Sequence, residues 1–339
     1  MTAAAAFDNS ISQLLSPRAF LGRNQRNEYL KTIPRSLHRI TCISEDEHSV
    51  LGSQREPGGV PPFACGFGKT SDTLHMLATA DEDGHVCLYD TQGVSKLAKE
   101  WAAHNNAIFD LKWADTEPWV VTASGDQTAA LWDVKRGCRL AVFKQHSSSL
   151  KSVSFRPGDR NVFATGARDG RIMMWDIRCN HKEGPPSYHT PVNTIADGHV
   201  PTRPTTPKPT KRQRLTPTAN STKSSVTAVV FNDEFSLISA GATESTIKVW
   251  DMRTIYKKSS RKPVPKYEYP YCGTSTRNIG FSSLILNSGR SCVYASCTDD
   301  VIYAFNCLGV NRYPVACYMG HSNSTFYVKS ASQVMTHFF

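Results

Sequence analysis

The chain has 339 residues, a net charge of +10 and 40% hydrophobic residues. This apolar content suffices for a sizeable core and excludes wholesale disorder. No apolar run approaches the roughly 18 residues that span a bilayer, which excludes an integral membrane protein. The ten cysteines form no CxxC pair. We therefore expect no zinc site, and reduced, mostly buried thiols in an intracellular protein.

The positive charge lies in two segments. Residues 200–224 contribute +6 and residues 253–270 contribute +5, which leaves −1 for the rest of the chain. The body of the protein is thus nearly neutral. A generally basic surface for nucleic acid is not indicated.

Residues 1–45 are expected to form an irregular N-terminal segment. They lack the apolar core of a secretory signal, since Pro17 and Arg18 follow soon after Leu14 and Leu15. An alternative is a transit peptide, because acidic residues are scarce and arginines recur. These arginines are Arg18, Arg23, Arg26, Arg35 and Arg39.

A repeat follows. Three windows end in an aromatic–Asp pair at intervals of 43 residues, and each has an aspartate six residues before the aromatic residue. The windows are ATADEDGHVCLYD (78–90), TASGDQTAALWD (122–133) and TGARDGRIMMWD (165–176). A fourth copy (239–251) comes 75 residues after the third, so 32 residues are inserted, and a fifth (295–306) ends in Phe305-Asn306.

Each copy predicts two short strands joined by a tight turn. Ile172 and Met174 show the alternation of a strand, and Asp-Gly at 83–84 and 169–170 favours a hairpin. A histidine and a further alternating run precede three copies. This unit resembles the WD-repeat family over roughly residues 75–322. The resemblance implies an all-β, WD-repeat β-propeller of four-stranded blades.

A histidine, a hydroxyl residue and an aspartate recur before the tryptophan. The sets are His104, Thr122, Asp126 with Trp132, and His146, Thr165, Asp169 with Trp175. By composition they match hydrolase triads, but a triad needs one exposed nucleophile in a cleft, not several copies. In WD-repeat proteins these residues form a buried hydrogen-bonded tetrad, so the resemblance implies a structural role. We expect no catalysis, no cofactor and no metal; an enzyme is the disfavoured alternative.

Arginine follows two of the Trp-Asp pairs by two positions. The runs are Trp175, Asp176, Arg178 and Trp250, Asp251, Arg253. Each arginine could simply pair with a local carboxylate. In the WD-repeat family, however, WDxR marks proteins that dock on the damage-binding adaptor of cullin-4 ubiquitin ligases. A guanidinium fork suits such bidentate recognition.

Longer stretches resemble one family in particular, from about residue 40 to residue 330. They include VPPFACGF (60–67), EWAAHNNAIFDLKW (100–113), RDGRIMMWDIRCN (168–180), YPYCGTSTRNIGFSSLIL (269–286), CTDDVIYAFN (297–306) and GHSNSTFYVKS (320–330). These look like the denticleless protein homologue family, the substrate receptor of the cullin-4 RING ubiquitin ligase.

This resemblance implies a non-catalytic subunit that directs ubiquitination of replication and cell-cycle regulators bound to the sliding clamp on DNA. The implied partners are the adaptor and those substrate proteins, with an indirect association with DNA, no membrane and no small-molecule substrate. The implied location is the nucleus, on chromatin in S phase or after damage, with some cytoplasmic protein. The alternative is a nuclear WD-repeat scaffold or chromatin peptide reader without a ligase role.

The insert at 200–224 has five prolines and almost no apolar residues, which predicts a disordered basic loop. It is either a tolerated insertion or a nuclear-import segment. The import candidates are Lys208, Lys211, Arg212 and Arg214, and the possible phosphosites are Thr206 and Thr216. The second basic segment, 253–270, is either an exposed connector or a rim that meets an acidic surface.

The repeat ends early. A sixth unit starts at 320–330, and residues 331–339 hold no hairpin and no Trp-Asp pair. Because the family carries seven blades, we predict a propeller at 46–330 with about five and a half of seven blades, then an atypical end at 331–339. We interpret the chain as a truncated isoform or an incomplete gene model; a non-functional truncated isoform is a further alternative.

Overall fold

The computed structural model describes residues 60–92, 96–179, 181–182, 187–199, 225–255, 263–275, 279–323 and 329–330. All of these belong to one compact unit, Val50–Ser332. The predicted segments 1–45, 200–224 and 331–339 lie outside the described residues and stay predictions. In the part that is described, we find no helix with the length and apolar character needed to cross a membrane.

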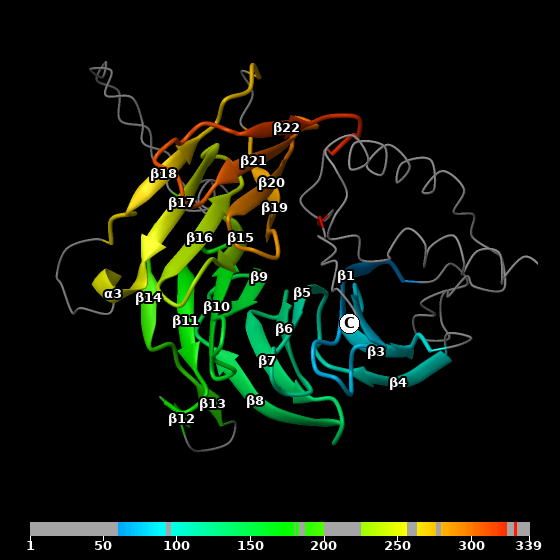
Figure 1. Ribbon diagram of the computed structural model, residues 1–339. Coiled ribbons are helices and arrows are strands. Elements are labelled where there is room, and N and C mark those ends of the chain that lie inside the picture. Colours follow the sequence, from blue (N-terminus) through cyan, green and yellow to red (C-terminus); the bar gives the residue numbers. More distant parts are fainter. Residues whose placement is uncertain are drawn as a thin grey trace, which may run out of the picture. The chain divides into compact units, whose positions relative to one another are not determined.

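The described strands form five sheets, one for each copy of the repeat (Figure 1). Blade one contains β1 (Pro62–Phe67), β2 (Met76–Asp81), β3 (His85–Asp90) and β4 (Lys96–Ala102). Blade two contains β5 (Ile108–Trp113), β6 (Trp119–Ser124), β7 (Thr128–Asp133) and β8 (Cys138–Lys144). Blade three contains β9 (Leu150–Phe155), β10 (Val162–Ala167), β11 (Ile172–Asp176) and β14 (Asn193–Ile195).

Blade four contains β15 (Val226–Phe231), β16 (Ser236–Gly241), β17 (Thr246–Asp251) and β18 (Tyr267–Pro270), with the short helix α3 (Met252–Ile255) after β17. Blade five contains β19 (Phe281–Leu286), β20 (Cys292–Cys297), β21 (Ile302–Asn306) and β22 (Ala316–Tyr318). Neighbouring strands within these four-strand sets pair antiparallel. Every aromatic–Asp pair, or its Phe305-Asn306 counterpart, ends the third strand of its blade. The prediction of an all-β WD-repeat propeller is confirmed.

The turn between the second and third strands takes one backbone form in all five blades. The residue after the acidic position has a positive φ in each case. These residues are Gly84 (φ 89°), Gln127 (71°), Gly170 (77°), Ser245 (57°) and Asp300 (67°). Glycine adopts this conformation without steric cost, which explains the two Asp-Gly pairs. The other three turns hold a side chain in the same left-handed geometry.

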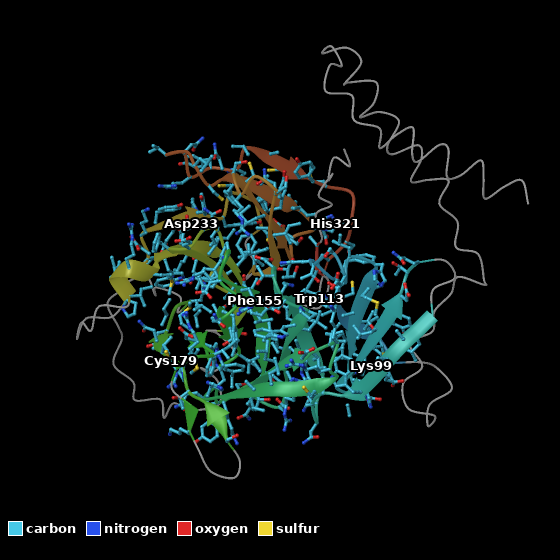
Figure 2. All side chains as sticks on the ribbon, turned by 60° about the horizontal axis from the view of Figure 1, so that its bottom comes forward. Lys99, Trp113, Phe155, Cys179, Asp233 and His321 are labelled. Carbon is cyan, nitrogen blue, oxygen red and sulfur yellow. The ribbon has the colours of Figure 1, made fainter. Side chains whose placement is uncertain are left out.

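The blades pack through their first strands, in the order β1, β5, β9, β15 and β19. Neighbouring first strands run in the same direction: the Val229 amide donates to Ser152 Oγ at 3.1 Å, and the Phe231 amide donates to Ser154 Oγ at 3.1 Å. Apolar side chains fill the four interfaces between successive blades. Trp113 and Phe155, labelled in Figure 2, are among these buried side chains. Corresponding ends of the blades therefore lie at the same face.

Two features were not predicted. The hairpin of β12 (His181–Lys182) and β13 (Tyr188–His189) leaves blade three and joins the outer edge of blade two, where β13 pairs parallel with β8. Lys329 donates to Asp110 of β5 at 2.8 Å, while the amide of its neighbour Ser330 donates to Ser283 of β19 at 3.1 Å. The described residues of 320–330, where a sixth blade was expected to start, form no strand.

The expectation of mostly buried thiols is wrong. Of the nine described cysteines, all free, only Cys87 and Cys297 are buried and five are exposed. The exposed thiols are Cys65 on β1, Cys138 and Cys317 on the fourth strands β8 and β22, and Cys179 and Cys272 in loops.

Candidate docking face

The recurrent histidine sets form hydrogen-bonded chains inside blades two and three. In blade three, Trp175 Nε1 donates to Thr165 Oγ1 at 2.8 Å, and Thr165 Oγ1 lies 2.8 Å from His146 Nε2. His146 Nδ1 lies 3.0 Å from Asp169 Oδ2. A neutral imidazole that donates from Nδ1 to the carboxylate and accepts at Nε2 from the hydroxyl satisfies every group.

Blade two repeats the chain with slightly longer contacts. Trp132 Nε1 lies 3.3 Å from Thr122 Oγ1, which lies 2.7 Å from His104 Nε2, and His104 Nδ1 lies 2.8 Å from Asp126 Oδ2. Burial works to raise the pKa of Asp126, but the hydrogen bonds from His104 and Thr128 outweigh it and lower that pKa. The same balance lowers the pKa of Asp169.

These sets cannot act as hydrolase triads in this structure. The hydroxyls of Thr122 and Thr165 belong to residues with 0% exposure, so no substrate carbonyl can reach them. A nucleophile must be accessible and face a cleft. Among the described residues, no cluster of His, Cys, Asp and Glu has the arrangement of a metal site.

Blade four contains a third tetrad that the sequence analysis did not assign. Trp250 Nε1 donates to Ser239 Oγ at 2.8 Å, and Ser239 Oγ lies 2.7 Å from His199 Nε2. His199 Nδ1 lies 2.8 Å from Glu244 Oε2. In the sequence, residues 200–224 separate His199 from the fourth copy of the repeat, which hides the pairing. Glu244, at the acidic position of that copy, was the signal that could have revealed the tetrad. Burial lowers the pKa of His199, which favours the neutral imidazole.

Arg178 lies at the end of blade three where the Trp-Asp strand stops, which we call the Trp-Asp end. Its Nε donates to Asp176 Oδ1 at 2.9 Å and its Nη2 donates to Asp176 Oδ2 at 2.7 Å. The backbone amide of Arg178 also donates to Asp176 Oδ1 at 2.9 Å. The carboxylate therefore fixes both the loop and the guanidinium, while 58% of the arginine side chain stays exposed. The hydrogen bond from Arg178 lowers the pKa of Asp176.

Arg253 repeats this geometry at the Trp-Asp end of blade four. Its Nε and Nη2 donate to Asp251 at 3.1 Å and 2.9 Å, and its amide donates to Asp251 Oδ1 at 3.0 Å. Its side chain is 62% exposed. Because the blades are oriented alike, Arg178 and Arg253 belong to the same face of adjacent blades. Each arginine thus pairs with a local carboxylate, as the sequence allowed, and this ion pair holds its guanidinium in one orientation.

The tryptophans of these runs do not reach the surface. Trp175 is 0% exposed and Trp250 is 2% exposed, so neither side chain can touch a partner. In blade two, Lys135 replaces the arginine, and its Nζ contacts Asp72 of blade one at 2.6 Å rather than its own Asp133. The oriented fork is thus a property of the third and fourth blades.

The remaining candidates divide between two regions. The import candidates (Lys208, Lys211, Arg212, Arg214) and the possible phosphosites (Thr206, Thr216) lie outside the described residues. In the second basic segment, Tyr269 is buried and its hydroxyl donates to the Asn306 carbonyl at 3.1 Å. Tyr269 is therefore part of the interface between blades four and five and not of a contact rim.

Comparisons with known proteins agree with this architecture. The WD domain, G-beta repeat, matches residues 95–133, 137–176 and 213–251. The chain is 45% identical to a denticleless protein homolog of Gallus gallus over 93% of this chain and 44% of that protein. Over the matched residues, this chain belongs to the denticleless homolog family. It is 48% identical to the homolog of Homo sapiens over 86% of this chain and 40% of that protein.

A more distant member of the family gives the same result. Protein lethal(2)denticleless of Drosophila melanogaster is 41% identical over 88% of this chain and 40% of its own length. The chain thus spans less than half the length of these denticleless relatives.

Proposed function

We propose that this chain is the WD-repeat part of a substrate receptor of a cullin-4 RING ubiquitin ligase, and that Arg178 and Arg253 dock it on the damage-binding adaptor. One observation carries the proposal: two exposed guanidiniums are held in the same geometry at the same end of adjacent blades. Each is fixed before any partner arrives, which lowers the entropy lost on binding. Membership of the denticleless family supports the proposal.

In this proposal the opposite face of the propeller receives the substrates, which are replication and cell-cycle regulators displayed on the sliding clamp. The chain itself performs no chemistry. It acts in the nucleus and meets DNA indirectly, through its substrates.

Binding to purified adaptor tests the docking. We expect the wild-type chain to bind and the Arg178→Ala/Arg253→Ala variant to lose binding. Replacing both arginines by lysine keeps the charge but removes the planar fork, so this variant should also bind weakly.

The matched control is Arg168→Ala/Arg171→Ala. These exposed arginines flank the turn between β10 and β11, at the other end of blade three, and their loss removes the same charge. The control should bind like the wild type. Equal binding by the docking variant and the wild type, or no binding by a folded wild-type chain, would contradict the proposal.

A further inference from the structure

Phe235 occupies a position that repeats in every blade. The amide that follows each aromatic–Asp pair, or its Phe305-Asn306 counterpart, donates to the carbonyl of the residue immediately before the second strand. The accepting residues are His75, Pro118, Asn161, Phe235 and Ser291, at 2.7–3.0 Å. Four of these residues are partly buried. Phe235 alone among the five is a large apolar side chain, and it is 44% exposed.

The turn that carries Phe235 is rigid. Asp233, labelled in Figure 2, accepts hydrogen bonds from the amides of Phe235 and Ser236 at 2.7 Å and 2.8 Å. From blade five, Arg290 Nη1 donates to the carbonyls of Phe231 and Asn232 at 3.0 Å and 3.1 Å. The exposed ring is therefore presented by a backbone that is fixed from both sides.

The ring lies against the proposed docking arginine. The guanidinium carbon of Arg253 lies 5.2 Å from the centroid of the Phe235 ring, within the range of a cation–π contact. The amide of Met252, next to Arg253 in the chain, donates to the Phe235 carbonyl at 2.7 Å. Ring, guanidinium and Asp251 thus form one connected element at the Trp-Asp end of blade four.

The charge on this element is already balanced, because Asp251 pairs with Arg253. Net charge consequently supplies little attraction for a partner, and exposed ion pairs contribute little in any case. A rigid, exposed aromatic ring beside an oriented arginine is the combination that dominates many protein interfaces. Such an element fits a partner with an apolar recess whose rim offers hydrogen-bond acceptors.

We propose that the Phe235 ring inserts into an apolar recess of the adaptor and is the principal apolar contact of the blade-four docking element. This inference rests on the proposed adaptor docking and adds a contact that the arginines alone do not provide. Blade three has Asn161 at the equivalent position, so blade four supplies the apolar part of the interface and blade three a polar part.

The test measures the dissociation constant (Kd) of the chain for purified adaptor at physiological ionic strength. We expect Phe235→Ala to raise Kd about 30-fold, the effect typical of a buried interface anchor. The matched control is Tyr318→Ala, since Tyr318 is 50% exposed on β22 and pairs with Ile302, at the end of blade five away from Asn306. This control should change Kd less than about threefold. Phe235→Asn copies blade three at this position and should weaken binding like Phe235→Ala.

A second measurement separates direct contact from support of the arginine. If the ring contacts the adaptor, Phe235→Ala/Arg253→Ala binds more weakly than Arg253→Ala alone. If the ring only positions Arg253, the double variant binds like Arg253→Ala, and the inference is overturned. Circular dichroism checks that each variant is folded.

The outcomes also separate this inference from the proposed function. Wild-type affinity in both Phe235 variants, with loss of binding in Arg178→Ala/Arg253→Ala, overturns the inference and leaves the docking proposal standing. A folded wild-type chain that does not bind the adaptor overturns both.

Discussion

Thr165 is the centre of the blade-three tetrad, and replacing it by valine tests the structural role of these sets. Thr165 is 0% exposed, and valine has nearly the same shape, so the substitution leaves no large cavity. It removes the acceptor of Trp175 Nε1 and the partner of His146 Nε2, both at 2.8 Å. Each buried polar group left without a partner costs about 1–3 kcal/mol, and burial of the extra methyl group returns about 1 kcal/mol. For the two groups together, we expect Thr165→Val to lower the free energy of unfolding by about 1–5 kcal/mol.

Urea denaturation followed by far-UV circular dichroism measures this loss. Thr116 is exposed in the loop between β5 and β6, so Thr116→Val is the control and should change the free energy of unfolding by less than about 0.5 kcal/mol. The tetrad argument fails if Thr165→Val matches this control.

A double-mutant cycle sharpens the same test. Blade five has Phe305 and Ala295 at the positions of Trp175 and Thr165, so it lacks both the indole N–H and the hydroxyl. In Thr165→Val/Trp175→Phe no indole N–H is left without a partner. The double variant should therefore be more stable than the sum of the single losses predicts, by about 1 kcal/mol or more. Additive losses would refute the hydrogen-bonded chain.

Three further predictions follow from backbone strain, pH and buried charge. At Gly84 the φ is 89°, and an added Cβ would lie 2.3 Å from a backbone carbonyl oxygen, so Gly84→Ala should lower the unfolding free energy by at least about 2 kcal/mol. The control is Gly158→Ala, where the φ is 72° but no atom lies within 4 Å of the added Cβ, and the loss should be about 1 kcal/mol. Burial lowers the pKa of His199 below 6.5; the unfolded chain then binds the extra proton, so stability falls as pH decreases below about 6.5, and His199→Gln should flatten this part of the urea-denaturation pH profile. Asp110→Asn removes the buried carboxylate that pairs with Lys329, and should lower the unfolding free energy by about 2–3 kcal/mol in the same assay. This loss is smaller than that for a fully buried ion pair because the Lys329 side chain is 22% exposed.

The sequence predicts the blades because each one repeats its own local signals. The aromatic–Asp pair fixes the end of the third strand, and Asp-Gly fixes the turn before it, so the register follows without knowledge of any distant contact. The tetrads of blades two and three are recoverable for the same reason. In blade four the insert breaks the spacing, which is why Ser239 and His199 were not paired in advance.

Long-range choices were not predictable from these local patterns. The hairpin after Arg178 joins blade two, where β13 pairs with β8 and His189 stacks on Phe143 with ring centroids 5.0 Å apart. No pattern in the sequence of the hairpin identifies β8 as the strand with which it pairs. Lys329 likewise pairs with Asp110 on β5, which lies far earlier in the sequence. An aspartate within a predicted strand gives no sign of which distant lysine it will contact.

The aspartate of the Trp-Asp pair explains how one motif serves the fold and would also serve the proposed docking. Asp176 binds the amide two residues ahead, which shapes the loop after the third strand, and its two oxygens also hold the Arg178 fork. Arginine two positions on has the length and the parallel donors to reach both oxygens, whereas lysine is a single point donor. In blade two the loop differs, since Asp133 accepts the amide of Arg136, and Lys135 contacts Asp72 instead. The arginine proposed for docking is therefore oriented by the same aspartate that shapes the loop after the third strand.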